Sequence, residues 1–424
     1  PTPWENYAYD ANDLAPLTNP TGSNVPASHY YTPKSSEVDA LGRTIQTTEF
    51  FDNTNYANTI DMNYRYDVRG NLLEVKDPYS RTVFELVYDL RTPQKEQPLP
   101  PIKTKHIDKG ISRILFDVTG KPIESNDAKG AQALSAYDVI SRPTHSWAKN
   151  KTGDTITLRN YLLYGEGATT PSTFNLNGKA YQSYDEAGFV ETPVFDFKGN
   201  LLTKNRQVIS SATLKAQLDT YTTFIVDWTG LPSILDSFVF ETNMEYDALN
   251  RITKLTLPLD LETDRREIIP GYNSAGALEK VELKDASTTT TYVENIAYNA
   301  KGQRLMIAFG NDVMTRYAYD PITFRLLRQR SEKYTKTQVG NTITYAYSSG
   351  TTKQDDGFNF DLIGNIVKIL TRVTDCGISS GALGSNALDR EFEYDPIYRL
   401  TYADGRESNT QSGNNYLYDD APAP

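Results

Sequence analysis

The chain has 424 residues and a net charge of −11, which argues against a nucleic-acid partner, because such a partner would call for a basic stripe. It contains no run of 18 successive apolar residues, which argues against a membrane-spanning helix. Cys376 is the only cysteine, and His29, His106 and His145 lie far apart in the sequence, so neither an intrachain disulfide nor a local Cys/His zinc site is expected.

The apolar content is low for a chain of this length. Counted with Gly and without Tyr, apolar residues form about 37% of the chain, against roughly 45–50% in typical globular proteins. Charged residues form 23%, which does not indicate disorder. A sheet exposed to water on both faces needs fewer apolar residues than a globular core, and an array of repeats is not limited by the size of one core.

The N-terminal part, residues 1–60, opens with an acidic stretch, Tyr7–Leu14. This stretch predicts one helical turn with Asp10 or Asn12 as its cap. Asp10, Asn12 and Asp13 also resemble part of a calcium loop, but the Gly and the late Glu of an EF-hand are missing, which favours a cap or a turn. Four prolines then predict a loop, and the repeats begin at Val38.

One short motif recurs through the rest of the chain. It is an aromatic residue, Asp or Asn, two variable residues, usually Gly, a polar residue and an apolar one, as in Tyr66-Asp67-Val68-Arg69-Gly70-Asn71-Leu72. Successive copies in the second half are 26, 26 and 21 residues apart, so a unit of about 20–26 residues accounts for most of the spacing. The twelve copies, some of them loose, begin at Val38, Tyr66, Phe116, Tyr137, Tyr184, Phe195, Tyr246, Tyr272, Tyr298, Tyr319, Phe360 and Tyr394.

The motif predicts a β-hairpin turn. Aromatic residues favour strands, and an Asp or Asn side chain can bond the backbone two residues on and open a turn. Gly three residues after the Asp supplies the positive φ that ends a type I turn with a bulge. Asp67, Asp196 and Asp361 are therefore expected to form turns in which Gly70, Gly199 and Gly364 have positive φ. Asn250 tolerates the same conformation, whereas Ser141 does so poorly.

Alternating apolar and polar residues predict the strands themselves. Met62, Tyr64 and Tyr66 alternate with polar neighbours, a pattern typical of a strand with two unlike faces. The remaining predicted strands are Leu72–Val75, Phe84–Tyr88, Asn160–Tyr164, Thr315–Tyr319, Thr342–Tyr347 and Arg390–Tyr394.

Three segments interrupt the strand pattern. The proline-rich run Gln97–Pro101 predicts an extended connecting loop, with an SH3-type ligand as the alternative. Ser211–Asp219 predicts a short helix capped by Ser210 or Ser211, with Leu214 and Leu218 on one face that packs on the sheet. Residues 373–389, rich in Gly, Ser and Ala, predict a disordered loop that contains Cys376.

The sequence contains no motif of a known catalytic type. Gly-x-Ser-x-Gly, His-Glu-x-x-His and Gly-x-x-x-x-Gly-Lys are all missing, and Gly165-Glu166-Gly167 lacks the third Gly of a phosphate-binding loop. Asp355-Asp356 and Asp419-Asp420 are expected to be solvated pairs in loops. We therefore expect no catalytic, cofactor-binding or metal-binding residue and no cofactor.

The motif Tyr-Asp-x-x-Gly-Arg/Asn resembles that of the Rhs or YD-repeat family, and the resemblance covers essentially the whole chain. Two longer phrases, Tyr184–Leu202 and Phe392–Leu400, are similar to the Rhs-containing parts of bacterial toxin-complex B and C components. The family's shell usually ends in a self-cleaving aspartyl protease marked by Asp-Pro-x-Gly-Leu. Asp77-Pro78, Asp320-Pro321 and Asp395-Pro396 lack the Gly-Leu, so no catalytic aspartate is assigned and the segment would lie upstream of the cleavage site.

The fold expected from the motif and the resemblance is all-β, with repetitive antiparallel hairpins that form a large spiralling sheet, a hollow shell or part of one, and at most one or two short helices. We expect an N-terminal lead-in with the first repeat (1–60), the first half of the repeat sheet (61–206), a connecting insertion with a short helix (207–245) and the second half of the sheet (246–424). Pro1 and the final Ala-Pro-Ala-Pro suggest a segment of a longer polypeptide.

The function implied by the resemblance is structural: a shell segment of a secreted or extracellular bacterial toxin protein, which encapsulates and protects a C-terminal cytotoxic polypeptide before delivery. Its partners would be the enclosed toxin, the remaining shell of the same or a partner chain, and a pore-forming or injector component. One alternative is an extracellular adhesin, as the related teneurins are, in which Trp4, Trp147 and Trp228 could stack on glycans. Another is a hydrolase that uses paired carboxylates.

Overall fold

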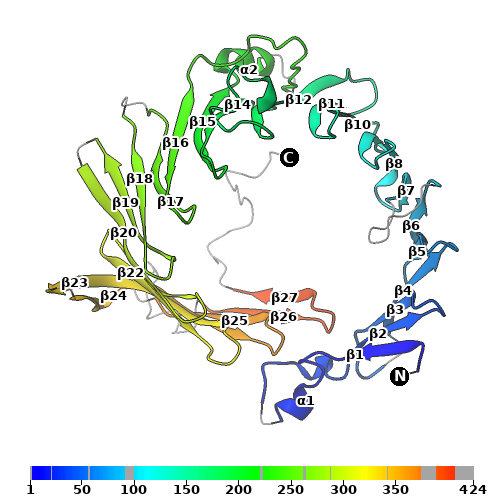
Figure 1. The fold of residues 1–424 in the computed structure, drawn as a ribbon. Helices are drawn as coiled ribbons and strands as arrows, with labels where there is room; N and C mark the ends of the chain where they lie inside the picture. Colours follow the sequence, from blue (N-terminus) through cyan, green and yellow to red (C-terminus); the bar gives the residue numbers. More distant parts are fainter. Residues whose placement is uncertain are drawn as a thin grey trace. The chain divides into compact units, whose positions relative to one another are not determined.

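The structure is a computed structural model that describes residues 2–20, 22–55, 58–90, 100–219, 223–260, 264–286, 288–340, 342–373 and 388–405. These residues form 27 strands in one antiparallel sheet and two short α-helices (Figure 1), so the expected all-β fold is confirmed. Neither helix of this described chain has the length or the apolar character needed to span a membrane.

The chain divides into two compact units. Unit 1 comprises Pro1–Ser35, Thr48–Ile60 and Ile296–Pro424, and unit 2 comprises Ser36–Thr47 and Asp61–Asn295.

Unit 2 consists almost wholly of strands. The elements that lie entirely or mostly in it are β2 (Lys34–Val38), β3 (Thr44–Phe50), β4 (Thr59–Tyr66), β5 (Leu72–Lys76), β6 (Thr82–Val87), β7 (Lys103–His106), β8 (Gly110–Phe116), β9 (Pro122–Asn126), β10 (Gln132–Tyr137), β11 (Pro143–Lys149), β12 (Thr157–Tyr164), η2 (Gly165–Gly167), β13 (Ala180–Asp185), β14 (Gly188–Phe195), β15 (Leu201–Val208), α2 (Ser211–Leu218), β16 (Phe240–Tyr246), β17 (Ile252–Thr256), β18 (Glu267–Tyr272), β19 (Leu278–Asp285) and β20 (Thr288–Tyr298).

Unit 1 combines the N-terminal segment with the last strands of the chain. Its elements are β1 (Glu5–Ala8), α1 (Ala15–Thr18), η1 (Ala27–His29), β21 (Arg304–Phe309), β22 (Val313–Tyr319), β23 (Leu326–Val339), β24 (Thr342–Phe360), β25 (Ile366–Thr371), β26 (Arg390–Tyr394) and β27 (Leu400–Asp404).

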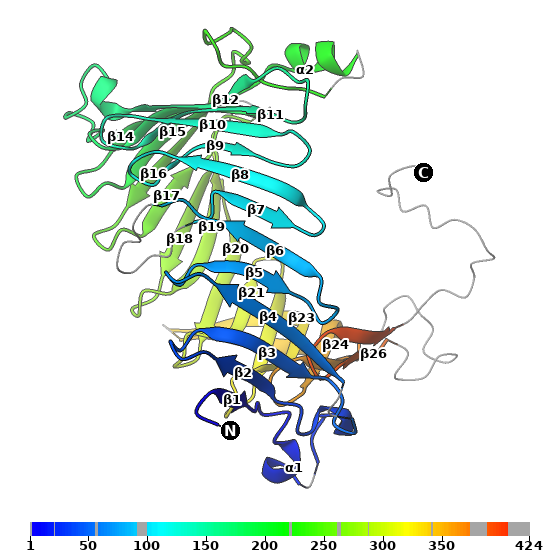
Figure 2. The same ribbon diagram turned by 90° about the vertical axis from the view of Figure 1, so that its right-hand side faces the viewer.

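Within each unit, successive strands pair with each other in antiparallel hairpins. In unit 2 this antiparallel pairing runs without interruption from β4 to β20. Figure 2 shows β4 to β12 side by side in chain order. In unit 1 the same pairing runs from β21 to β27. The fold is therefore a succession of local hairpins, as the repeat motif predicts.

Few side chains of the described chain are fully buried, in keeping with its low apolar content. The larger buried cluster centres on Leu158, Ile209, Val226 and Trp228, and Leu214 of α2 packs against it. A smaller cluster in unit 1 contains Ala308, Met314 and Tyr334. Most other strand residues are partly exposed. The sheet is thus stabilised mainly by its hydrogen bonds and by contacts between neighbouring strands, which are the usual unit of sheet stability.

The two helices test two sequence predictions. The N–H of Thr213 donates to the hydroxyl of Ser210 at 3.2 Å, so Ser210 caps α2, as expected. The side chain of Leu218 lies outside the described part. The prediction for the N-terminal turn is wrong in detail, because α1 begins at Ala15 and has no side-chain cap.

Asp10 and Asn12 have other roles than capping α1. Asp10 opens the preceding turn by accepting from the N–H groups of Asn12 and Asp13 at 2.8 and 3.0 Å. The side chain of Asn12 instead contacts a turn at the other end of the sequence, as described below.

Some predictions fall on residues that the structure does not describe. Residues 91–99 hold most of the proline-rich run, 374–387 include Cys376, and 406–424 include Asp419 and Asp420. The interpretations of these segments stay predictions.

Candidate functional site

The turn between β4 and β5 shows how the repeat motif folds. The N–H of Asp67 bonds the carbonyl of Asn71 at 2.9 Å, and the N–H of Gly70 bonds the carbonyl of Asp67 at 3.1 Å. The carboxylate of Asp67 accepts from the N–H groups of Arg69 and Asn71 and from the side-chain amide of Asn71, at 2.8 to 2.9 Å. Gly70 has a φ of 89°. This is the expected type I turn closed by a positive-φ bulge.

Ten of the twelve copies close with the same bond, from the N–H of the Asp or Asn to the carbonyl four residues on. Ser141 and Asn250 take the glycine position with φ of 72° and 62°, so even Ser adopts the left-handed conformation here. The turn at Asp320 is one residue longer. The ten copies are those at Asp39, Asp67, Asp117, Asp138, Asp196, Asp247, Asn273, Asn299, Asp361 and Asp395.

All of these turns follow even-numbered strands. Asp67 follows β4, Asp138 follows β10 and Asp247 follows β16. Successive antiparallel strands run in opposite directions. Every second connection therefore lies at the same ends of the strands, along one side of the sheet. Within each unit the repeat turns therefore lie along one edge, which we call the turn edge. The spacing of about 20–26 residues is the length of one hairpin and its return.

The polar residue that follows the glycine position links one turn to the next. The guanidinium of Arg43 donates to the Asp39 carboxylate at 2.7 Å and to the carbonyl of Asp67 at 2.9 Å, and it lies 5.0 Å from the centre of the Tyr66 ring. Arg142 similarly bonds its own Asp138 and lies 3.8 Å from the centre of the Tyr164 ring. Arg251 makes the same two contacts, with Asp247 and the Tyr272 ring, so arginines at this position contact their own carboxylate and the next aromatic ring.

The tyrosine hydroxyl completes the link in the opposite direction. Tyr137 donates to the carbonyl of Pro122 at 2.9 Å, and Tyr272 donates to that of Ile252 at 2.9 Å. In both cases the acceptor is the residue after the polar position of the previous repeat turn. The same bond recurs at Tyr164, Tyr319 and Tyr394.

The electrostatics of the turn edge favour ionised carboxylates. The hydrogen bond from the Arg43 guanidinium lowers the pKa of Asp39. The backbone N–H of Arg142 lowers the pKa of Asp138, and its guanidinium acts in the same direction. These carboxylates are occupied as hydrogen-bond acceptors within their own turns, an arrangement that builds structure and leaves little capacity for proton transfer.

Sequence reasoning missed two turns and misplaced a third. Asp77 and Asp127 form the same turn, with Ser80 and Gly130 at positive φ, but Lys76 and Asn126 stand where the motif has an aromatic residue. Both turns follow odd-numbered strands, so they lie at the opposite edge. The aspartate and the glycine-position spacing alone would have identified Asp127. The motif copy that begins at Tyr184 forms a different turn, because Asp185 pairs with Gly188 across a two-residue turn.

A second contact region, within unit 1, joins the N-terminal segment to the last repeat turns. The side-chain amide of Asn12 donates to the carboxylate of Asp361 at 2.9 Å, and its oxygen accepts from the N–H of Leu362 at 3.0 Å. His29 is buried, and its Nε2 lies 2.8 Å from the carbonyl oxygen of Tyr394. The N-terminal segment therefore covers the turns after β24 and β26.

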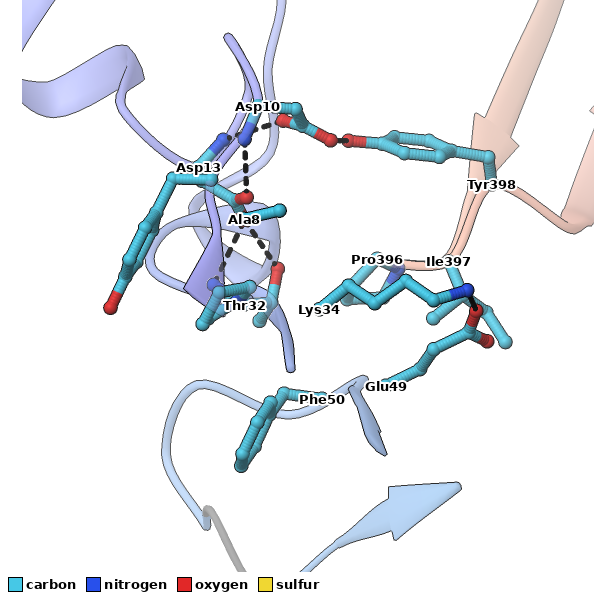
Figure 3. A pocket seen from close by; sticks show the side chains of 12 residues that line it. Ala8, Asp10, Asp13, Thr32, Lys34, Glu49, Phe50, Pro396, Ile397 and Tyr398 are labelled. Atoms are coloured by element: carbon cyan, nitrogen blue, oxygen red, sulfur yellow. Dashed lines mark hydrogen bonds and ion pairs between the residues drawn. The ribbon is translucent and has the colours of Figure 1, made fainter. Parts of the chain in front are cut away.

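A pocket of about 290 Å³ lies in this region (Figure 3). The hydroxyl of Tyr398 donates to the carboxylate of Asp10. Asp13 accepts from the N–H and the hydroxyl of Thr32 at 2.9 and 3.0 Å, and burial raises its pKa. Lys34 and Glu49 form an ion pair at 2.7 Å. Each acidic group that lines the pocket thus has a partner, which fits a docking contact better than a catalytic centre.

Within the described part of the chain, no three His, Cys, Asp or Glu side chains gather in a way that could hold a metal ion. The prediction that Asp355 and Asp356 form a solvated loop pair is wrong, because both lie inside β24 and Asp355 is only 5% exposed. Arg328 bonds both oxygens of Asp355, at 2.7 and 2.6 Å.

The aromatic and histidine candidates are mostly packed against other side chains. Trp228 is 1% exposed, Trp147 packs against the same buried cluster, and Trp4 is exposed. His145 stacks between Trp147 and Tyr161.

Comparison with known proteins agrees with the repeat motif. No protein-family model matches the chain. The chain is 22% identical over 387 residues to toxin subunit YenC2 of Yersinia entomophaga, across 85% of this chain and 36% of that protein. Toxin subunit YenC1 of the same organism is 24% identical over 318 residues, across 72% of this chain and 30% of that protein. The chain thus spans about a third of the length of these curated relatives.

Solved structures share the fold. This chain superposes on the crystal structure of TcdB2–TccC3 with a TM-score of 0.76 and 23% sequence identity. The superposition covers 95% of this chain and 18% of the TcdB2–TccC3 chain. A structure of the Photorhabdus luminescens Tc holotoxin pore matches with the same values. The resemblance of this chain to the Rhs-repeat part of bacterial toxin-complex components, first drawn from its repeat motif, is thereby confirmed.

Proposed function

We propose that this chain is a wall segment of an Rhs/YD-repeat toxin protein, whose complete shell encloses and protects a C-terminal cytotoxic polypeptide before delivery. The observation that carries the proposal is the uninterrupted hairpin pairing from β4 to β20, with linked repeat turns along one edge. A sheet of this kind extends by adding hairpins and needs no large core, which is what a wall requires.

The similarity to toxin subunits supports the proposal. It extends over 72–85% of this chain, whereas the aligned part makes up only 30–36% of each relative. The remaining shell and the enclosed polypeptide would then belong to the rest of the same protein or to a partner chain, and a pore-forming or injector component would release the cargo. The protein would act outside the bacterial cell.

The role we propose is structural and not enzymatic. The recurrent aspartates are turn acceptors, and their oxygens already bind backbone N–H groups and the neighbouring Arg or Asn side chain. The inside surface would act by exclusion: it would keep the cargo apart from outside partners and deny it the space to fold.

Protease protection tests this function in the full-length natural protein. The C-terminal cargo region should resist a nonspecific protease while the shell is intact, and should be cleaved rapidly once the shell is unfolded by denaturant. Cleavage of that region at the same rate in the native full-length protein and in the isolated region would refute enclosure.

A further inference from the structure

A pocket of about 430 Å³ lies on β21 to β24 of unit 1. Its lining includes Arg316, Arg328, Arg330 and Tyr347. Its volume lies within the range of about 300–1,000 Å³ that is usual for small-molecule sites. The repeat motif explains none of these side chains, because none of them belongs to a turn.

The strand register gathers the three arginines on one face. Arg316 of β22 stands directly opposite Arg330 of β23, and Ala318 stands opposite Arg328. Like charges placed opposite each other destabilise a sheet unless other groups compensate them.

Two buried carboxylates supply that compensation. Glu332 is 1% exposed, and its two oxygens lie 2.6 Å from Nη2 of Arg316 and 2.7 Å from Nη2 of Arg330. The two carboxylate oxygens of Asp355 accept from Nε and Nη2 of Arg328. Buried charges of this kind persist only when they are paired and hydrogen-bonded.

The pairing leaves the pocket cationic within a strongly acidic chain. Three guanidinium groups share two carboxylates, and the buried Nε atoms of Arg316 and Arg330 make no hydrogen bond. The Arg316 guanidinium also lies 4.2 Å from the centre of the Tyr347 ring. Tyr347 is 52% exposed and Leu305 is 41% exposed, so they add apolar surface beside the positive charge.

We propose that this pocket binds a carboxylate group carried on an apolar body. The excess of one positive charge matches a monoanion, and the planar guanidinium fork matches the two oxygens of a carboxylate. Tyr347 and Leu305 would contact the apolar part of the ligand. Such a group can come from a free aromatic acid or from the C-terminal carboxylate of a peptide that ends in an aromatic residue.

Calorimetric titration of the whole chain tests the assignment. The probes are 3-phenylpropanoate, the tripeptide Gly-Gly-Phe, and the neutral amide of each as its matched control. We expect at least one carboxylate to bind about ten-fold more tightly than its amide, the effect of one charged hydrogen bond. Tighter binding of 3-phenylpropanoate would identify the ligand as a free aromatic acid, and tighter binding of Gly-Gly-Phe would identify it as the C-terminus of a peptide. Equal affinity of acid and amide, or tighter binding of inorganic phosphate, would overturn the proposal.

A substitution in the pocket gives a second measurement. Arg316→Gln removes one guanidinium and leaves Glu332 paired with Arg330, so the charges balance and affinity should fall about ten-fold. Circular dichroism verifies that this variant is folded. Unchanged affinity in the folded variant would contradict the site.

A tethered carboxylate tests the pocket without any added ligand. Ala318 is exposed and lines the pocket, and Ala318→Glu would place a carboxylate opposite Arg328, whereas Ala318→Gln is the neutral control of equal size. We expect Ala318→Glu to slow amide hydrogen exchange in β22 and β23 relative to Ala318→Gln, and to abolish binding of the free carboxylate. Equal exchange and unimpaired binding would overturn the proposal.

Discussion

Asn12 and Asp361 are 349 residues apart in the sequence, and yet the amide of Asn12 donates to the carboxylate of Asp361 at 2.9 Å with both residues buried. Asp361 uses its remaining acceptor capacity within its own turn, for the N–H of Asn365 and the side-chain amide of Asn365. A repeat turn that would otherwise face water is therefore covered by the N-terminal segment. Because the contact closes a very long loop, it ties the first residues of unit 1 to the last strands.

Replacing Asn12 should loosen this contact. Asn12→Ala removes one hydrogen-bond partner from the buried Asp361 carboxylate and one from the N–H of Leu362. The loss should lower the free energy of unfolding by about 1–3 kcal/mol. Hydrogen exchange at the end of β24 and the start of β25 should become faster. Asn19→Ala, at an exposed position, is the control and should leave exchange unchanged. An equal effect of both substitutions would show that the Asn12 contact does not hold the segment in place.

The links along the turn edge predict a local effect of Arg142→Gln. This change removes the bond to Asp138, the pair with Glu166 at 2.9 Å and the contact with the Tyr164 ring. Because these groups are partly exposed, exchange in β10 to β12 should rise by only roughly two- to five-fold. Arg113→Gln, at an exposed position on β8, is the matched control. Equal exchange rates in the two variants would contradict the proposed role of Arg142 in linking the turns.

The glycine position of the motif predicts a cost that is purely conformational. Gly70 has a φ of 89°, and a Cβ added there would meet no atom within 4 Å. Gly70→Ala should therefore destabilise the β4–β5 hairpin by about 1 kcal/mol through backbone strain alone. Gly167 is equally open and has no such φ, so Gly167→Ala should be almost neutral. Thermal unfolding and local hydrogen exchange of the two variants measure this difference, and equal destabilisation by both substitutions would contradict a conformational origin.

The lowered pKa values at the turn edge predict how stability varies with pH. Asp39 and Asp247 have pKa values below that of free Asp, lowered first by the Arg43 guanidinium and by the backbone N–H of Arg251, respectively. A depressed folded-state pKa stabilises the fold above the unfolded value of about 3.9, and the contribution is lost as pH falls through the lowered value. Acid titration followed by hydrogen exchange should show the repeat turns opening below about pH 4. Turns that become more protected in this range would contradict the assigned direction.

The parts of the fold that sequence could predict are the local ones. Asp67, Gly70 and their equivalents interact within five residues, so the turn and its positive φ follow from residue type alone. The pairing of successive strands follows from the hairpins.

The parts that could not be predicted depend on distant contacts. Nothing near Asn12 indicates that its partner is Asp361. Asp355-Asp356-Gly357 looks like a loop, but β24 continues through it because Arg328 on the neighbouring strand neutralises Asp355. The bond from Arg43 to the carbonyl of Asp67 joins residues 24 positions apart, so the spacing within one motif does not predict it.

The central claim is that linked hairpins of this chain form part of a wall around a cargo. Electron cryo-microscopy of the full-length natural protein tests it most directly. The account predicts a closed cavity, bounded in part by β4 to β20, that contains weak density from an unfolded polypeptide. A solid packing of sheets with no internal space, or a cavity open to solvent and free of polypeptide, would contradict it.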